Sequence, residues 1–273
     1  MTESPHTSDS APLLVSIVTV VYNGAATLER TIRSVREQTY PHLHYVVIDG
    51  GSTDGTLDII TQHADFIDHW VSEPDRGISD AFNKGIAACR GAVIGLLNAD
   101  DWYEPDTVEQ VVARHAQGDI FYGKLRYWQG EQPGYVFGAN HRLLKREMSI
   151  NHPAVFMRSA VFAQFGNFSV DYTCAMDYEL LLRCYLGQAR FVAIDTVLTN
   201  MQRAGISDAN WRTGCREVLQ AKRQHLGPSI KHHLWFQKQV WAIRLSRWLE
   251  QSRGRAFLRW YRARLSPVQK TTD

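Results

Sequence analysis

Several features that define other protein classes are scarce in this sequence of 273 residues. Its four cysteines, Cys89, Cys174, Cys184 and Cys215, form no C-x-x-C pair. Their spacing excludes a disulfide-stapled fold and favours reduced thiols. No run approaches the ~18 to 20 apolar residues that a membrane span needs. Residues 1–12 are polar and lack the pattern of a signal peptide, so we expect a disordered lead-in followed by a cytoplasmic protein.

Net charge is also small, because 30 Lys and Arg residues oppose 28 Asp and Glu residues and leave +2. Taken whole, this value indicates no special attraction to nucleic acid or to a membrane. The charge is unevenly distributed, however. Between Arg212 and Leu265 thirteen basic residues face only two acidic ones, a net +11, whereas residues 1–211 carry −9. We therefore treat 13–210 as one domain and 211–273 as a basic tail.

Apolar runs and helical patterns alternate along the first 200 residues. The run LLVSIVTVV at 13–21 is typical of a strand buried on both faces of a parallel sheet, and residues 27–38 have helical spacing. Further strands are expected at 44–48, 92–97, 119–128 and 154–157, and further helices from 56 and at 78–89, 159–165 and 177–186. The βαβα order predicts an α/β fold with a mostly parallel central sheet and helices on both faces.

Two of the expected strands end in acidic residues. Asp49 follows one strand, and Asp100 and Asp101 follow another. Ligands of such sheets bind at the carboxyl ends of the strands, and clustered carboxylates repel one another unless a cation or hydrogen-bond donors hold them. A divalent cation bridging to phosphate is one solution. The alternative is that these are ordinary turn or helix-capping aspartates.

Five strings in order carry a family resemblance: SIVTVVYNGAATLERTIRSVREQTY, VVIDGGSTDGT, SEPDRGISDAFNKGI, GLLNADD and MDYELLLR. Together they cover about residues 14–207 and resemble the family-two glycosyltransferases of the GT-A fold. The likeness is greatest to the bacterial group that builds exopolysaccharide, O-antigen or capsule. This resemblance implies a nucleotide-sugar donor and a divalent metal, Mg²⁺ or Mn²⁺.

The same resemblance implies donor-binding roles for residues in three segments: Val20, Tyr22 and Asn23; Asp49; and Asp80, Asn83 and Gly85. The first group would contact the nucleoside, and Asp49 would accept the imide N–H of the base, usually uracil. The third group falls where the family covers the nucleoside and sugar, although Phe82 replaces a frequent Arg there. For Asn83 and Gly85 the alternative is an ordinary helix interior.

Asn98-Ala99-Asp100 occupies the position of the family's Asp-x-Asp motif. The resemblance assigns Asn98 to the donor and the metal to Asp100, with Asp101 helping directly or through water. An amide adds no negative charge, so we expect weaker metal affinity than with two aspartates.

Met176-Asp177-Tyr178-Glu179 resembles the family's Glu-Asp motif, which implies that Asp177 is the catalytic base. A base is needed because the acceptor hydroxyl loses its proton as it attacks. Asp177 also opens a helix, so a capping role is the alternative, and Glu179 is the alternative base.

Two further residues have roles implied by the resemblance. His152 would line the acceptor or donor pocket, and the alternative is a hydrogen-bonded structural histidine. Arg203 would neutralise the leaving diphosphate, and the alternative is a solvated surface arginine.

In the tail, Leu234, Trp241, Leu245 and Trp248 recur on one helical face, and Phe257, Tyr261 and Leu265 repeat the spacing. Basic amphipathic helices rich in Trp suit an anionic membrane surface. The alternative is that the stripe packs on the catalytic domain or on a second subunit, as in a homodimer. Nucleic acid is disfavoured because the catalytic part is acidic and no base-reading motif is present.

The resemblance implies transfer of a single sugar, most often from a UDP-sugar, to a glycan or lipid-linked acceptor, with inversion. Asn98 and Met176 keep open the alternative of a nucleotide-sugar-binding protein without turnover. A processive synthase is disfavoured, since Arg244 stands where the Gln-x-x-Arg-Trp motif requires Gln. If the tail binds lipid, the protein lies at the inner face of the cell membrane.

Overall fold

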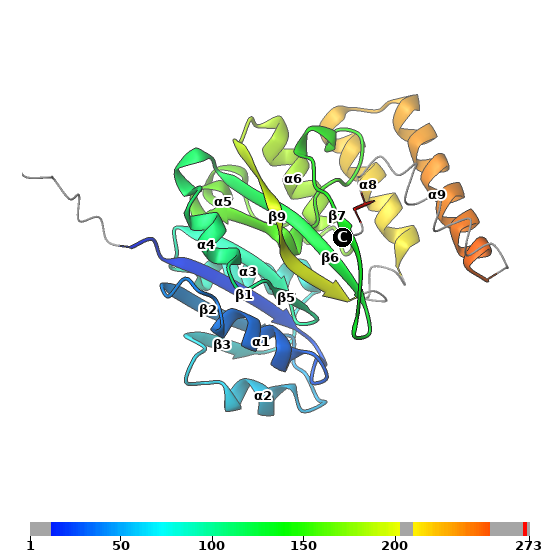
Figure 1. Cartoon of the computed structure of the whole chain (residues 1–273). Helices are drawn as coiled ribbons and strands as arrows, with labels where there is room; N and C mark the ends of the chain where they lie inside the picture. Colours follow the sequence, from blue (N-terminus) through cyan, green and yellow to red (C-terminus); the bar gives the residue numbers. More distant parts are fainter. Residues whose placement is uncertain (1–11, 203–209, 252–269, 272–273) are drawn as a thin grey trace, which may run out of the picture.

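A computed structural model describes residues 12–202, 210–251 and 270–271 (Figure 1). The strands are β1 (Val15–Val21), β2 (Leu43–Asp49), β3 (His69–Ser72), β4 (Val93–Asn98), β5 (Asp101–Tyr103), β6 (Ile120–Gln129), β7 (Gln132–Phe137), β8 (Val155–Arg158), β9 (Phe191–Gln202) and β10 (Lys270–Thr271). The α-helices are α1 (Leu28–Arg36), α2 (Thr56–Gln62), α3 (Ile78–Ala88), α4 (Thr107–Val112), α5 (Ser159–Phe165), α6 (Met176–Leu186), α8 (Trp211–Leu226) and α9 (Ile230–Gln251). Short 3₁₀ turns lie at His115–Gln117, His141–Leu143 and His152–Ala154.

Within the described residues the strands form one sheet in the order β10-β7-β6-β8-β4-β1-β2-β3, and β9 pairs with β5 and β6 off this path. Strands β3, β2, β1 and β4 are parallel. Strand β8 runs antiparallel to both of its neighbours, β4 and β6. The predicted α/β architecture, with helices on both faces of a central sheet, is therefore confirmed, and the second half of the sheet is mixed (Figure 1).

Burial on both sides explains why β1 is an unbroken apolar run. All seven of its residues are buried, and successive side chains point to opposite faces. Val18 belongs to the core cluster that includes Phe82 of α3, and Ile17 belongs to the cluster that includes Leu28 and Ile32 of α1. Each face of the sheet thus has its own apolar core.

The predicted strands and helices of the first 190 residues are present, but the sequence patterns predict none of β3, β5, β7, β9 and α4. Strand β3 is a four-residue edge strand with half its residues exposed. Strand β7 contains Pro133 and Gly134, two residue types that disfavour the prediction of a strand from sequence. In β9 the register shifts opposite Lys124, so its apolar alternation is broken.

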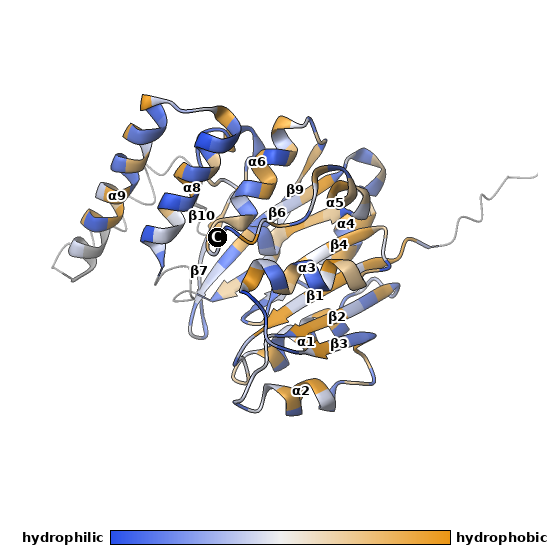
Figure 2. Ribbon diagram, turned by 180° about the vertical axis from the view of Figure 1, so that it is seen from behind, coloured by the Kyte–Doolittle hydropathy of each residue, from blue (hydrophilic) through white to orange (hydrophobic). Residues whose placement is uncertain are grey.

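The basic tail divides at Gly227, the residue that ends α8. Helix α8 packs on α6, and its Val218 and Ala221 are buried in the same core cluster as Leu181. Helix α9 packs on the outer side of α8 and lies at the margin of the molecule (Figures 1 and 2). No helix in the described ranges is both long and apolar enough to cross a membrane. The predicted helix containing Phe257 lies outside the described residues.

Gly85 provides a test of the packing between α3 and β1. A Cβ at this position would lie 2.2 Å from Val18 Cγ1 and 3.3 Å from Ile48 Cγ1. We expect Gly85→Ala to lower the free energy of unfolding by about 1–3 kcal/mol, measured by urea denaturation. Gly214→Ala in α8 is the control, because its nearest neighbour would be Cys174 Cβ at 3.7 Å. Equal stability of the two variants would contradict this account.

Candidate functional site

The carboxyl ends of β1, β2 and β4 meet at one edge of the sheet. Val21 pairs with Asp49 across β1 and β2, and Val20 pairs with Asn98 across β1 and β4. Parallel pairing in register therefore brings the two acidic strand ends together, as the sequence predicts. Val20 itself is 7% exposed and packs in the core.

Asp49 organises the loop that follows β2. Its side chain is 0% exposed, and Oδ2 accepts hydrogen bonds from the backbone N–H of Gly51 (3.1 Å) and of Ser52 (3.0 Å) and from the hydroxyl of Ser72 (2.6 Å). The Ser52 hydroxyl donates to Oδ1. Both carboxylate oxygens of Asp49 therefore already accept hydrogen bonds from within the protein. The base of a bound nucleotide would reach the Asp49 carboxylate only if this loop moved.

Asn23 ties the first loop to the second. Its backbone N–H donates to Ser52 Oγ at 2.7 Å, and its Oδ1 accepts from the Thr53 N–H at 2.9 Å. Its φ of 50° lies in the left-handed region, which asparagine adopts more readily than most residues. Asn23 thus shapes the site through the backbone.

An exposed aromatic ring lies beside this edge. Tyr22 is 67% exposed, and a Cβ built on Gly50 would lie 3.4 Å from Tyr22 Cδ2 and 2.5 Å from Asp75 Oδ2. The exposed ring of Tyr22, the half-buried Gly50 and the half-buried carboxylate of Asp75 therefore adjoin one another. The sequence reasoning does not single out Asp75, although its motif, SEPDRGISDAFNKGI, contains it.

The helix α3 residues have structural partners. Asp80 receives hydrogen bonds from the Arg76 side chain (2.8 Å) and backbone (3.1 Å), and the Arg76 side-chain bond lowers the pKa of Asp80. Asn83 forms two hydrogen bonds with the backbone of Phe168, at 2.9 and 3.0 Å. Gly85 is the close packing position described above. Donor binding by these three residues stays a prediction.

At the end of β4, Asn98 and Asp101 form a buried pair. Asn98 Nδ2 donates to Asp101 Oδ2 at 3.0 Å, and the other oxygens, Asn98 Oδ1 and Asp101 Oδ1, are buried without a hydrogen-bond partner. Thr31 of α1 holds the turn between them by donating to the carbonyls of Ala99 (2.9 Å) and Asp101 (2.7 Å). The turn that carries Asp100 is therefore anchored from both sides.

The two aspartates of this turn differ in exposure. Asp101 is 0% exposed; burial raises its pKa well above the usual range, and the charge of Asp100 adds to the rise. Asp100 is half-buried, and burial raises its pKa while the charges of His152 and Arg30 oppose that rise. The Arg30 guanidinium lies 3.6 Å from the Trp102 ring centroid. Asp100 is thus the carboxylate of this pair that a ligand can reach.

His152 connects the strand ends to α6. Its Nδ1 lies 3.5 Å from Asp177 Oδ2, its Nε2 is buried without a partner, and its ring packs edge-on against Phe82. Asp177 Oδ1 accepts from the N–H of Tyr178 at 2.7 Å, so Asp177 does not cap the helix; Ala175 is the N-cap residue. The structure therefore brings Asp100, His152 and Asp177 into one neighbourhood.

Glu179 faces the other side of α6, toward α8. It is 2% exposed and accepts two hydrogen bonds from Arg183, at 3.0 and 2.8 Å, and one from His225 at 2.7 Å. The structure does not bring it to Asp177 or His152. Its role as acceptor-pocket residue or base stays a prediction, and Arg203 lies outside the described residues.

Glu217 of α8 is a residue that the sequence reasoning misses. It is 7% exposed, and its carboxylate accepts from the backbone N–H groups of Thr173 (3.0 Å), Cys174 (2.8 Å) and Ala175 (2.8 Å). These are the residues that lead into α6, two positions before Asp177. The available signal is that Glu217 is one of only two acidic residues in the segment 212–265.

No group of three or more His, Cys, Asp or Glu side chains in the described ranges is placed to hold a metal ion by itself. Asp100, with the buried Asn98 Oδ1 beside it, still offers oxygen atoms of the type that Mg²⁺ and Mn²⁺ bind. Mg²⁺ at nucleotide sites commonly takes one or two carboxylates and fills its shell with phosphate oxygens and water. The residues therefore fit a cation that arrives with a diphosphate.

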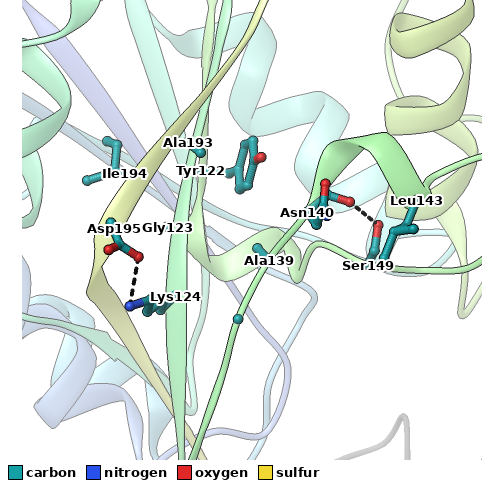
Figure 3. A pocket seen from close by; sticks show the side chains of 11 residues that line it. Tyr122, Gly123, Lys124, Ala139, Asn140, Leu143, Ser149, Ala193, Ile194 and Asp195 are labelled. Carbon is teal, nitrogen blue, oxygen red and sulfur yellow. Dashed lines mark hydrogen bonds and ion pairs between the residues drawn. The ribbon is translucent and has the colours of Figure 1, made fainter. Parts of the chain in front are cut away.

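A separate cavity of about 410 Å³ opens between β6, β9 and the loop after β7 (Figure 3). It is lined by Tyr122, Gly123, Lys124, Gly138, Ala139, Asn140, Leu143, Ser149, Ala193, Ile194 and Asp195. Lys124 and Asp195 form an ion pair of 2.8 Å at its rim. None of the predicted site residues lines it.

The sequence has clear relatives. Residues 16–174 match the family described as glycosyl transferase family 2. An uncharacterized glycosyltransferase of Mycobacterium tuberculosis (strain ATCC 25618 / H37Rv) is 32% identical over 205 residues, covering 72% of this chain and 78% of the relative. A PGL/p-HBAD biosynthesis glycosyltransferase of the same strain is 32% identical over 188 residues, covering 66% of this chain and 72% of the relative.

Solved structures share the fold. S. aureus TarS in complex with UDP-GlcNAc has a TM-score of 0.61 at 17% identity, covering 93% of this chain and 77% of the crystallised fragment. The mannosyltransferase PcManGT of Pyrobaculum calidifontis, in complex with GDP-Man and Mn²⁺, has a TM-score of 0.63 at 18% identity, covering 80% of this chain and 65% of that chain. The present chain spans 46% of the longer TarS structure.

The buried pair at the end of β4 gives a pH-dependent prediction. Because the folded chain favours neutral Asp101, the wild type takes up a proton on folding, and this contribution to stability is lost as pH rises toward the folded pKa. Asp101→Asn keeps the acceptor for Asn98 and does not titrate. We expect its unfolding free energy, relative to wild type, to increase from about pH 5 to about pH 8 in metal-free denaturation experiments.

The control is Asp195→Asn, which removes an exposed carboxylate paired with Lys124. That pairing lowers the pKa of Asp195 in the folded chain. The unfolding free energy of Asp195→Asn, relative to wild type, should therefore not increase as pH rises. A relative stability of Asp101→Asn that falls as pH rises would show that the folded chain holds Asp101 ionised.

Proposed function

Because this chain belongs to glycosyl transferase family 2, we propose that it transfers one sugar from a UDP-sugar to a hydroxyl of a glycan or lipid-linked saccharide, with inversion. The observation that carries the proposal is the neighbourhood of Asp100, His152 and Asp177 at the carboxyl edge of the sheet. It supplies a reachable carboxylate for a cation and a second carboxylate for a proton. These are the two groups that the reaction requires.

For the nucleoside, we propose the surface formed by Tyr22, Gly50 and Asp75. The exposed Tyr22 ring can stack on a base, and the missing side chain at Gly50 lets the base approach the backbone. The Asp75 carboxylate is suited to accept the imide N–H of uracil. Asp49 then acts by holding the loop through its buried hydrogen bonds, or by direct contact after loop movement. The bound UDP-GlcNAc and UDP of the TarS structures support a UDP-sugar donor.

For the diphosphate, Asp100 is the proposed protein ligand of a divalent cation, with Asn98 beside it and Asp101 buried behind. The cation supplies positive charge that stabilises the leaving diphosphate. Arg30 adds a fixed positive charge near the same aspartates. A single reachable carboxylate makes cation binding depend on the nucleotide.

For the acceptor, Asp177 is the proposed general base. The acceptor oxygen attacks the anomeric carbon from the face opposite the diphosphate, its proton passes to a carboxylate oxygen of Asp177, and the bond from the anomeric carbon to the diphosphate breaks. His152 Nδ1, 3.5 Å from Asp177 Oδ2, holds that carboxylate in orientation. Glu217 fixes the backbone just before it. The PGL/p-HBAD biosynthesis relatives support an acceptor of the cell envelope.

A donor panel tests the proposal. We expect purified protein to release UDP from at least one UDP-sugar in the presence of Mn²⁺, and EDTA to abolish that release until excess Mn²⁺ is restored. Binding of donors without any release, detected by thermal shift, would instead identify a nucleotide-sugar-binding protein without turnover. If EDTA did not affect UDP release, the assignment of a catalytic cation to Asp100 would be wrong.

Substitution of Asp177 tests the base. Because general base catalysis contributes ~10²–10⁴ in rate, we expect Asp177→Asn to lower kcat by about a hundredfold or more with KM for the donor nearly unchanged. Asp171→Asn, an exposed aspartate of the segment before α6, is the matched control and should keep wild-type turnover. If Asp177→Asn kept more than about a tenth of kcat with its fold intact, the base would be another residue.

A further inference from the structure

Helix α9 exposes an apolar stripe on its outer side. Ile230, Leu234, Trp241, Leu245 and Trp248 are 71%, 61%, 68%, 39% and 64% exposed. They are five of the eight large hydrophobic residues that are exposed in the described part of the chain. Single exposed apolar residues are ordinary on a protein surface, whereas a gathered set marks an interaction site.

The stripe is narrow. At 100° per residue, positions 230, 234, 241, 245 and 248 fall within an arc of about 60° on the helix. Over 22 residues the helix extends about 33 Å, so the stripe is a line of side chains along most of that length.

A different side of α9, about 110° around the helix from the centre of the stripe, makes the contact with the protein body. Trp235 packs against the core cluster, and its ring centroid lies 3.5 Å from the Nζ of Lys222 of α8. Lys222 also donates to the Arg146 carbonyl at 2.5 Å, and burial lowers its pKa to about 8. Because this inner face attaches α9, the outer stripe is not needed for that packing. Figure 2 shows α9 at the edge of the molecule, beyond α8.

Basic residues flank the stripe on both sides. At 100° per residue, Lys238 lies on one side of the arc and Arg244 on the other, and both are exposed. Residues 230–251 hold four basic residues, Lys231, Lys238, Arg244 and Arg247, and one acidic residue, Glu250, a net +3. The face thus combines exposed Trp and Leu side chains with positive charge.

We propose that this face of α9 docks on an anionic lipid surface, with the stripe in the interface and Lys238 and Arg244 near the headgroups. Tryptophan and leucine partition into the boundary between headgroups and acyl chains, and each nearby basic residue adds attraction to anionic lipid. A second copy of the chain fits this face less well. A symmetric dimer through it would place this basic face against its own copy, and within α9 the sequence has no acidic residue before Glu250 to pair with it.

Vesicle flotation of the full-length chain tests the docking. We expect wild type to float with vesicles of equal parts phosphatidylcholine and phosphatidylglycerol and to stay in the dense fraction with phosphatidylcholine alone. The triple variant Leu234→Gln, Trp241→Gln, Trp248→Gln should reduce the bound fraction by about tenfold or more, because three exposed apolar side chains are lost. Lys238→Gln and Arg244→Gln should each weaken binding by about fivefold at low salt.

Trp70→Gln with Val170→Gln is the control, because it removes exposed apolar side chains outside the tail and should float as wild type does. Wild type that does not float, or a triple variant that floats equally well, would overturn the proposal. Light scattering that shows a wild-type dimer and a monomeric triple variant, without flotation, would assign the face to a second copy. UDP release from the donor is measured in parallel, so failure of docking and failure of glycosyl transfer remain distinct results.

Discussion

Several carboxylates lie at one edge of the parallel sheet and repel one another, and the surrounding structure has to stabilise each of them. The pairing of β1 with β2 and β4 brings Asp49 and the Asp100–Asp101 turn to the same edge, and α6 adds Asp177. Each acid is stabilised in its own way. Asp49 is surrounded by hydrogen-bond donors, Asp101 is buried against Asn98 with a raised pKa, and Asp177 lies beside His152. Asp100 stays half-exposed, and a cation bound together with a diphosphate would supply the positive charge that stabilises its carboxylate.

The first helix of the basic tail supports this site from behind. Helix α8 places Glu217 on the backbone before Asp177 and His225 on Glu179. Those contacts occupy the Glu179 carboxylate and hold the backbone at the start of α6. The two acids of this short motif therefore lie in different environments: Glu179 faces α8, and Asp177 faces His152. Helix α9 is attached to α8 by its inner face only. The tail therefore contributes one helix to the catalytic body and presents another outward.

The sequence predicts the fold well for elements whose buried residues recur in a regular apolar pattern. The β1 run, the amphipathic α1 and the apolar β4 leave little ambiguity, and parallel pairing then predicts that Asp49 and Asp100 meet. It fails where structure depends on tertiary contacts. Strand β9 pairs with β6 through a register shift, Glu217 caps a helix start 42 residues earlier in the chain, and Asp75 reaches Gly50 across a loop. The nearly neutral net charge of the whole chain likewise conceals an acidic segment, 1–211, and a basic tail, which become visible when charge is counted along the sequence.

Calorimetric titration of UDP into the protein tests whether Asp100 holds a cation whose coordination the diphosphate completes. We expect Mn²⁺ to strengthen UDP binding to wild type, and Asp100→Asn to remove this strengthening while leaving the metal-free affinity for UDP unchanged. Equal strengthening by Mn²⁺ in wild type and Asp100→Asn would contradict it.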